Sequence, residues 1–120
     1  MEESTTLKDL KKKVADFRDE RDWRKFHNPK DLSIAIAIES AELEEKFLWK
    51  DMNEVNDFLK DAKNLDDVKD EMADIGILLL NLSDILNVDL SEAIINKINK
   101  NEIKYPAEKA KGIAKKYTEL

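Results

Sequence analysis

The stretch Leu32-Ser-Ile-Ala-Ile-Ala-Ile-Glu-Ser-Ala-Glu42 decides the fold. Its first seven residues carry apolar side chains around most of a helical circumference, which is typical of a helix buried on more than one side. A second run of this kind is Ile75-Gly-Ile-Leu-Leu-Leu80. Acidic residues adjoin both runs. The pattern therefore predicts two buried helices that carry carboxylates at the ends of their apolar segments.

The composition agrees with an all-helical protein. The chain has 120 residues, of which 42% are hydrophobic and 40% charged, with only two glycines and two prolines. This balance favours long helices with solvated faces over a turn-rich β fold. We predict an all-α four-helix bundle in which residues 1–106 form the domain and residues 107–120 form a lysine-rich C-terminal tail.

The first two helices can be located from periodicity and capping residues. Apolar residues at three- and four-residue steps predict a first helix from Thr6 to about Asp22. Asn28 is a favourable N-cap residue and Pro29 is favourable at the first helical position, so the second helix is expected to begin there. It is expected to run to about Trp49.

The second half of the chain predicts two more helices. The segment 51–64 is polar with scattered apolar residues and is expected to be a short helix or an ordered connection. Asn64 is expected to cap a third helix over residues 65–86. Asp89 is expected to cap a fourth helix, over residues 90–104, which the following proline ends.

Charge and residue content exclude several classes of function. The formal net charge is −6, so there is no broad cationic surface for a nucleic-acid polymer. There are no cysteines and only one histidine, which excludes thiolate zinc sites and histidine-rich metal sites. The N-terminal ten residues lack the pattern of a signal peptide, and no apolar run is long enough to span a bilayer. We expect a cytoplasmic protein without a membrane segment.

Four of the 27 acidic residues stand out by their surroundings. Glu39 directly follows one apolar run and Asp74 directly precedes the other. Each has a second acid on the same helix face, Glu42 and Glu71 respectively, at a spacing of three residues. Unpaired ions in a bundle cost several kcal/mol to desolvate, and residues 32–45 hold no lysine or arginine. A hard divalent cation, Mg²⁺ or Mn²⁺, would stabilise such a cluster, and the alternative is an interhelix network of ion pairs.

Five motifs in this order resemble the MazG-like all-α nucleoside triphosphate pyrophosphohydrolases, particularly the dCTP pyrophosphatase branch. The resemblance extends from about Phe17 to Pro106. The motifs are Phe17-Arg-Asp-Glu-Arg-Asp-Trp-Arg-Lys-Phe-His27, Glu39-x-x-Glu42, Phe47-Leu-Trp49, Glu71-Met-Ala-Asp74 and Lys97-x-x-x-Asn101-x-x-Lys104-Tyr105-Pro106.

The resemblance implies a reaction and a set of catalytic residues. The expected reaction is hydrolysis of a nucleoside triphosphate, such as dCTP or a modified dCTP, to the monophosphate and pyrophosphate. The expected cofactor is Mg²⁺, with Mn²⁺ as a substitute, and the resemblance assigns it to Glu39, Glu42, Glu71 and Asp74. Bound cations of this kind neutralise the triphosphate and activate water.

The resemblance also implies residues that bind the phosphates. Lys97, Asn101 and Tyr105 recur at four-residue steps, so they share one helix face from which polar groups can reach phosphate oxygens. Without the resemblance, Lys97 would be read as a solvated lysine and Tyr105 as a packing residue.

By the same resemblance, Trp23, His27 and Trp49 form the nucleobase site. Flat rings supply stacking, and a polar ring atom supplies a hydrogen bond. Without the resemblance, the tryptophans would be read as core residues and the histidine as structural.

Three alternatives stay open from the sequence. The broader family has a glutamate directly before the first acid, whereas this chain has Ile38, so the base preference is not fixed. Within the enzyme class, a dUTP-directed or phosphoribosyl-ATP-directed pyrophosphohydrolase is possible. From another class, the chain is a non-catalytic helical interaction module. In each case the abundant apolar surface predicts a homodimer or homotetramer.

Overall fold

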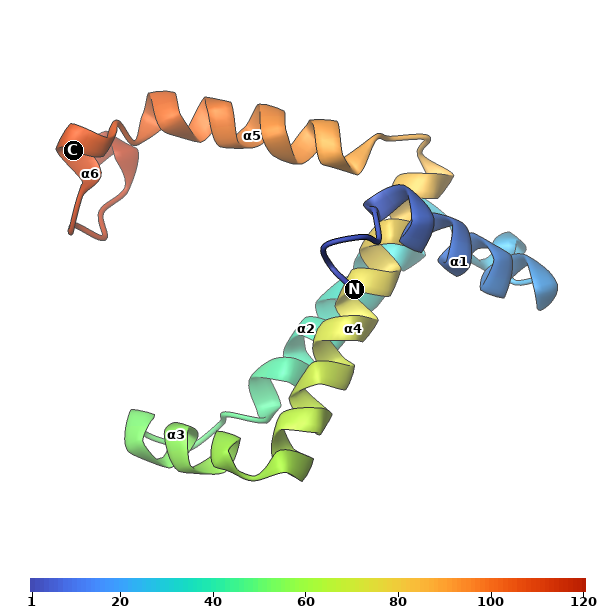
Figure 1. Ribbon diagram of the computed structural model, residues 1–120, viewed down its shortest axis with the longest axis horizontal. Helices are drawn as coiled ribbons and strands as arrows, with labels where there is room; N and C mark the ends of the chain where they lie inside the picture. Colours follow the sequence, from blue (N-terminus) through green and yellow to red (C-terminus); the bar gives the residue numbers. More distant parts are fainter. The chain divides into compact units, whose positions relative to one another are not determined.

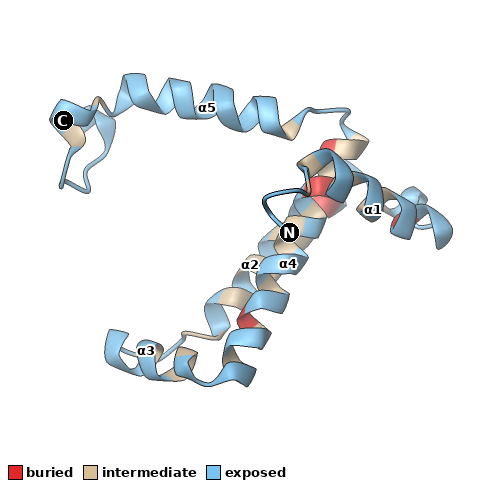
Figure 2. Ribbon diagram, in the orientation of Figure 1, coloured by how far each residue is buried: buried red, intermediate tan, exposed pale blue.

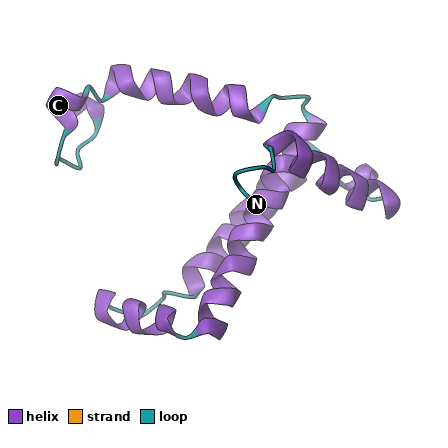
Figure 3. Ribbon diagram, in the orientation of Figure 1, coloured by secondary structure: helices purple, strands orange, loops and turns teal.

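The computed structural model describes residues 1–120, and every regular element in it is a helix (Figure 3). The prediction of an all-α protein is therefore confirmed. The chain divides into two compact units, residues 1–87 and 88–120, each of which is described by itself. The elements are α1 (Leu7–Glu20), η1 (Arg24–Phe26), α2 (Pro29–Glu45), α3 (Met52–Lys60), α4 (Ala62–Ile85), α5 (Leu90–Lys104), α6 (Ala107–Ala110) and η2 (Tyr117–Glu119).

In the first unit, α4 is the element that all other long helices contact. Helix α2 runs antiparallel beside it, and α1 and α3 also pack against it (Figure 1). The least exposed apolar side chains are Leu32 on α2 and Val68 and Leu80 on α4 (Figure 2). The four predicted metal ligands therefore lie on α2 and α4, the two helices with the most extensive contact in this unit.

Helix starts follow local capping chemistry. The Asn28 side chain accepts a hydrogen bond from the Asp31 N–H at 2.9 Å, and Pro29 opens α2, as predicted. The predicted cap of the third helix is wrong. Helix α4 begins earlier, because the Asp61 carboxylate accepts from the Lys63 N–H at 2.8 Å. Asn64 lies inside the first turn, where its side-chain amide donates to the Phe58 carbonyl at 3.0 Å.

Helix α2 ends four residues before the predicted position. Its last residue is Glu45, and residues 46–49 form a turn. Trp49 closes this turn with a φ of 63°, in the left-handed region that non-glycine residues rarely adopt. The polar segment that follows contains α3, which a reciprocal capping box of Asp51 and Glu54 begins.

The prediction that both apolar runs lie in helices buried on more than one side is met only in part by the single chain. Ile34 and Ile38 on α2, and Ile77 and Leu79 on α4, keep about half of their side-chain surface exposed. Exposed apolar area of this extent on adjacent helices is typical of a surface that another protein chain covers. None of the helices combines the length and apolar character that a membrane crossing requires.

The second unit consists of α5 and a short C-terminal segment. Helix α5 has the predicted bounds, and the Asp89 carboxylate caps it. At its other end, the Tyr105 ring meets Tyr117 edge to face, with ring centroids 6.1 Å apart. Within this unit no element covers the isoleucines of α5, which are Ile94, Ile95, Ile98 and Ile103.

Candidate active site

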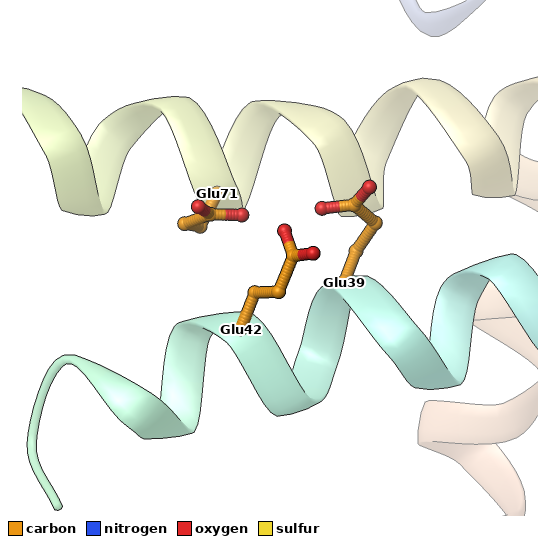
Figure 4. A group of neighbouring side chains, drawn as sticks. All are labelled: Glu39, Glu42 and Glu71. Atoms are coloured by element: carbon orange, nitrogen blue, oxygen red, sulfur yellow. The ribbon is translucent and has the colours of Figure 1, made fainter.

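Three carboxylates meet where α2 and α4 face each other (Figure 4). Glu39 and Glu42 project from one face of α2 because they are three residues apart. The antiparallel helix α4 brings Glu71 to the same place. Oxygens of the three side chains lie within 4.8 Å of one another, and all three residues are half-buried. We call this group the glutamate cluster.

The glutamate cluster has no cationic side chain as a partner. One oxygen of Glu39 and one of Glu71, the Oε2 atom in each case, is buried and accepts no hydrogen bond. All ion pairs of the chain involve other carboxylates. The interhelix ion-pair network considered above is therefore not what this structure contains. Buried carboxylate oxygens without partners are destabilising unless something else compensates them.

The surroundings of Glu39 raise the pKa of its carboxyl group. Its hydrogen bond to the Glu42 carboxyl, its burial and the negative charges of Glu42 and Asp74 raise the pKa of Glu39 to about 7. Each of these causes favours the protonated form of the Glu39 carboxyl. In the metal-free protein, this group therefore carries a proton at a pH where most carboxylates do not.

The raised pKa of Glu39 predicts how stability depends on pH in the metal-free protein. The folded-state pKa lies above the ordinary value of 4.5, so the folded state binds the proton more tightly than the unfolded state. The contribution is complete below pH 4.5 and is lost as the pH rises through about 7. We expect urea titrations in EDTA to show this decline in the free energy of unfolding and to show a flatter profile for Glu39→Gln. An equally steep decline in that variant would contradict the assignment.

Asp74, the fourth predicted acid, lies outside the glutamate cluster. Its side chain is exposed on α4, one turn after Glu71. Its charge is nevertheless close enough to contribute to the raised pKa of Glu39. Asp74 therefore belongs to the same electrostatic group without sharing the close contact of the three glutamates.

The donor set fits a hard divalent cation. All available ligands are carboxylate oxygens, which suit Mg²⁺ or Mn²⁺ and do not suit softer metals. The two buried oxygens of Glu39 and Glu71 have unused acceptor capacity directed at the shared space between α2 and α4. A bound cation would supply the missing positive charge, so the residues present fit the group that the sequence predicts.

An aromatic cluster lies at the N-terminal end of α2. The Trp23 ring packs edge to face on Phe17, with centroids 5.9 Å apart, and it is tilted against the His27 ring at 6.3 Å. The His27 Nδ1 atom lies 2.7 Å from the side-chain amide nitrogen of Asn81. Trp23 remains partly exposed, so its ring has a free surface on which another flat ring can stack.

Trp49 lies at the opposite end of α2 and is 90% exposed. Helix α2 separates it from His27 by 17 residues, which at the rise of an α-helix is about 25 Å. The structure therefore brings Trp23 and His27 together but does not bring Trp49 to them within one chain. No ring contact joins Trp49 to either residue.

The predicted phosphate-binding residues all lie in the second unit. Lys97 and Asn101 are exposed on α5, and Tyr105 follows its last residue. The four-residue steps between them are helical up to Tyr105, so the predicted common face is present on α5.

Sequence reasoning missed two polar residues beside the aromatic cluster. Arg18 and Asn81 are 2% and 3% exposed, and an Arg18 Nη1–H donates to the Asn81 Oδ1 atom at 2.9 Å. A local signal for Asn81 was present, because this asparagine follows the apolar run of α4 directly. Arg18 lies in a helix crowded with charged residues, where nothing in the pattern sets it apart.

Comparisons with known proteins identify the family of this chain. The sequence profile of the MazG-like family matches residues 34–120. The chain is 37% identical to dCTP pyrophosphatase 1 of Mus musculus and 36% identical to that of Homo sapiens, in each case over 96% of this chain and 68% of the relative. The crystal structure of a pyrophosphatase from Archaeoglobus fulgidus superposes with a TM-score of 0.77 at 40% identity, covering 83% of this chain and 92% of the other. The resemblance stated from the five motifs is confirmed.

Proposed function

Because the chain belongs to the MazG-like family, we propose that it is a Mg²⁺-dependent nucleoside triphosphate pyrophosphohydrolase that converts dCTP, or a modified dCTP, to the monophosphate and pyrophosphate. The observation that carries this proposal is the glutamate cluster, with its two buried oxygens that lack partners. The names of the curated relatives support the choice of dCTP.

The glutamate cluster and Asp74 hold the metal in this proposal. A Mg²⁺ ion held by these residues would supply positive charge for the triphosphate and would make the attacking water more acidic. A carboxylate of the cluster that contacts the attacking water accepts its proton. The water oxygen then bonds to the α-phosphorus, and the bond from that phosphorus to the bridging oxygen breaks, so pyrophosphate leaves.

Residues outside the cluster orient the nucleotide. Lys97, Asn101 and Tyr105 offer an ammonium, an amide and a phenol, all of which can donate hydrogen bonds to phosphate oxygens. Trp23 offers a partly exposed ring for stacking on the base, and the neighbouring His27 offers a polar ring atom. In this proposal the first three residues bind the triphosphate, and Trp23 and His27 bind the base.

A substrate panel tests the proposed function. Purified protein is incubated with each common dNTP and NTP in Mg²⁺, and nucleoside monophosphate and pyrophosphate are measured with an EDTA control. We expect pyrophosphate release that is strongest with dCTP and falls to background in EDTA. Preference for dUTP or phosphoribosyl-ATP would change the substrate within the enzyme class. No turnover by the folded protein would favour the non-catalytic interaction module.

We also propose that two copies of the chain build each site. Trp23 and Trp49 lie beyond opposite ends of α2, which is about 25 Å long, so they cannot stack on the same base within one chain. A second copy, in a homodimer or a homotetramer, can supply one of the two rings. The half-exposed isoleucines of α2 and the uncovered isoleucines of α5 provide apolar surface for such an assembly.

Mixing two variants that each lack one part of the proposed site tests whether the site is shared between copies. Glu42→Gln is mixed, unfolded and refolded with Trp23→Ala, and separately with Trp49→Ala. If one ring comes from the other copy, at least one mixture should recover about a quarter of the wild-type activity, because roughly half the dimers are mixed and each holds one intact site. Native mass spectrometry checks that mixed oligomers form. Mixed oligomers without any recovery in both experiments would show that each site uses one chain.

A further inference from the structure

The most deeply buried polar side chains of the first unit form a chain of hydrogen bonds from α1 to the aromatic cluster. Arg18 on α1 contacts Asn81 on α4, and Asn81 contacts His27. The other donors of Arg18 are also used, since Nε donates to the Asp19 Oδ1 atom at 2.8 Å and Nη1 donates to the Asp84 Oδ2 atom at 2.8 Å. The guanidinium is therefore held in one orientation by groups from two helices.

The donor groups of Arg18 determine the direction of each hydrogen bond in this series. A guanidinium has only donors, so the Asn81 atom that faces Arg18 must be the carbonyl oxygen. The amide nitrogen of Asn81, which carries two hydrogens, then faces His27 at 2.7 Å. The His27 Nδ1 atom must accept this bond, because an Nδ1–H would point at an amide hydrogen. The proton of the neutral imidazole is therefore on Nε2.

We propose that Arg18 and Asn81 are positioning residues that keep His27 in the Nε2–H form, so that it donates a hydrogen bond to an acceptor on the edge of a cytosine base. This inference rests on the proposed function, because it assigns a role to His27 at the nucleotide. Cytosine presents adjacent acceptors at O2 and N3, whereas uracil presents a donor at N3. A fixed Nε2–H donor that faces N3 therefore favours cytosine over uracil, because O2 is an acceptor in both bases.

The cost of burying these groups supports a role for them in the site. A leucine at position 81 would continue the apolar run of α4, whereas a buried amide is stabilising only when its donor and acceptor are both satisfied. Asn81 meets this condition, with Oδ1 on Arg18 and Nδ2 on His27. The network thus specifies one orientation of a ring beside Trp23, at the position where a base would stack.

The single histidine of the chain makes the tautomer directly measurable. In ¹H–¹⁵N NMR spectra of the side chain at alkaline pH, we expect wild-type His27 to show a protonated Nε2 and an unprotonated Nδ1. Asn81→Asp should reverse this pattern, since a carboxylate accepts from both Arg18 and an Nδ1–H. Asn56→Asp, an exposed change of the same type on α3, should leave the wild-type pattern. A wild-type spectrum with protonated Nδ1 overturns the proposal, even if Asn81→Asp does not fold.

Ligand titration and kinetics test the hydrogen bond to the base. Saturating dCMP should shift the Nε2–H proton signal of wild-type His27 downfield, and dUMP should shift it less. In Asn81→Asp, the ratio of kcat/KM for dCTP to that for dUTP should fall at least about tenfold, mainly through KM for dCTP. An Nε2–H signal that dCMP leaves unmoved overturns the proposal. Failure of the wild-type protein to hydrolyse any nucleotide is a different result, which counts against the proposed function.

Discussion

Glu42→Gln is expected to reduce kcat/KM for dCTP by at least about 10³-fold, which corresponds to about 4 kcal/mol of transition-state stabilisation. The glutamine keeps the size of the side chain but removes its charge and one anionic oxygen from the group in which the oxygens lie within 4.8 Å of one another. Steady-state kinetics of pyrophosphate release measures the effect, and circular dichroism checks that helix content is retained.

Glu44→Gln is the matched control for this variant. Glu44 is an exposed residue of the same helix, and it lies outside the glutamate cluster. Removing the charge of Glu44 should alter kcat/KM by less than a factor of about three, because solvent and salt screen an exposed charge outside the cluster. If both variants lose activity equally, or if Glu42→Gln retains full activity, the assignment of the metal site is wrong.

Leu32→Ala is expected to lower the free energy of unfolding by about 2–5 kcal/mol. Leu32 is 2% exposed, and it is one of only three buried apolar side chains in the chain. The free energy of unfolding of a small protein is only about 5–15 kcal/mol, so this single truncation removes a large fraction of that free energy. Urea denaturation, followed by circular dichroism, gives the change.

Leu86→Ala makes the same chemical change where the side chain is 51% exposed, at the end of α4. We expect a loss below about 1 kcal/mol there, since less apolar surface returns to water and no cavity forms. Losses of equal size in both variants would indicate that the buried position of Leu32 is not decisive. Both proteins should be compared at several concentrations, because association also contributes to apparent stability.

Local signals were sufficient to predict most helix starts but not the start of α4. Asn28 and Pro29 begin α2 as predicted, because capping depends on residues within one turn. For α4, both Asp61 and Asn64 can cap, and the local pattern does not distinguish them. A contact between α3 and α4 distinguishes them, because the Asn64 side-chain amide donates a hydrogen bond to the Phe58 carbonyl of α3 and Asp61 is left to cap α4.

The candidate site was predictable where its residues follow helical spacing. The two pairs of acids were identified from their three-residue spacing and their neighbours, and three of the four acids meet in the structure. The predicted length of the second helix already implied that Trp49 lies far from Trp23, although the family motifs assign both residues to one base site. The Arg18–Asn81 bond joins residues 63 positions apart, and no periodicity connects them.

The glutamate cluster places opposing demands on the contact between α2 and α4. Apolar residues at Glu39 and Glu71 would pack the two helices more favourably, but they would remove the carboxylates on which the proposed reaction depends. Such a site is a stability–activity trade-off, in which the most stabilising substitutions are also the most damaging to turnover. Engineering for thermal tolerance should therefore alter other helix contacts and leave this one unchanged.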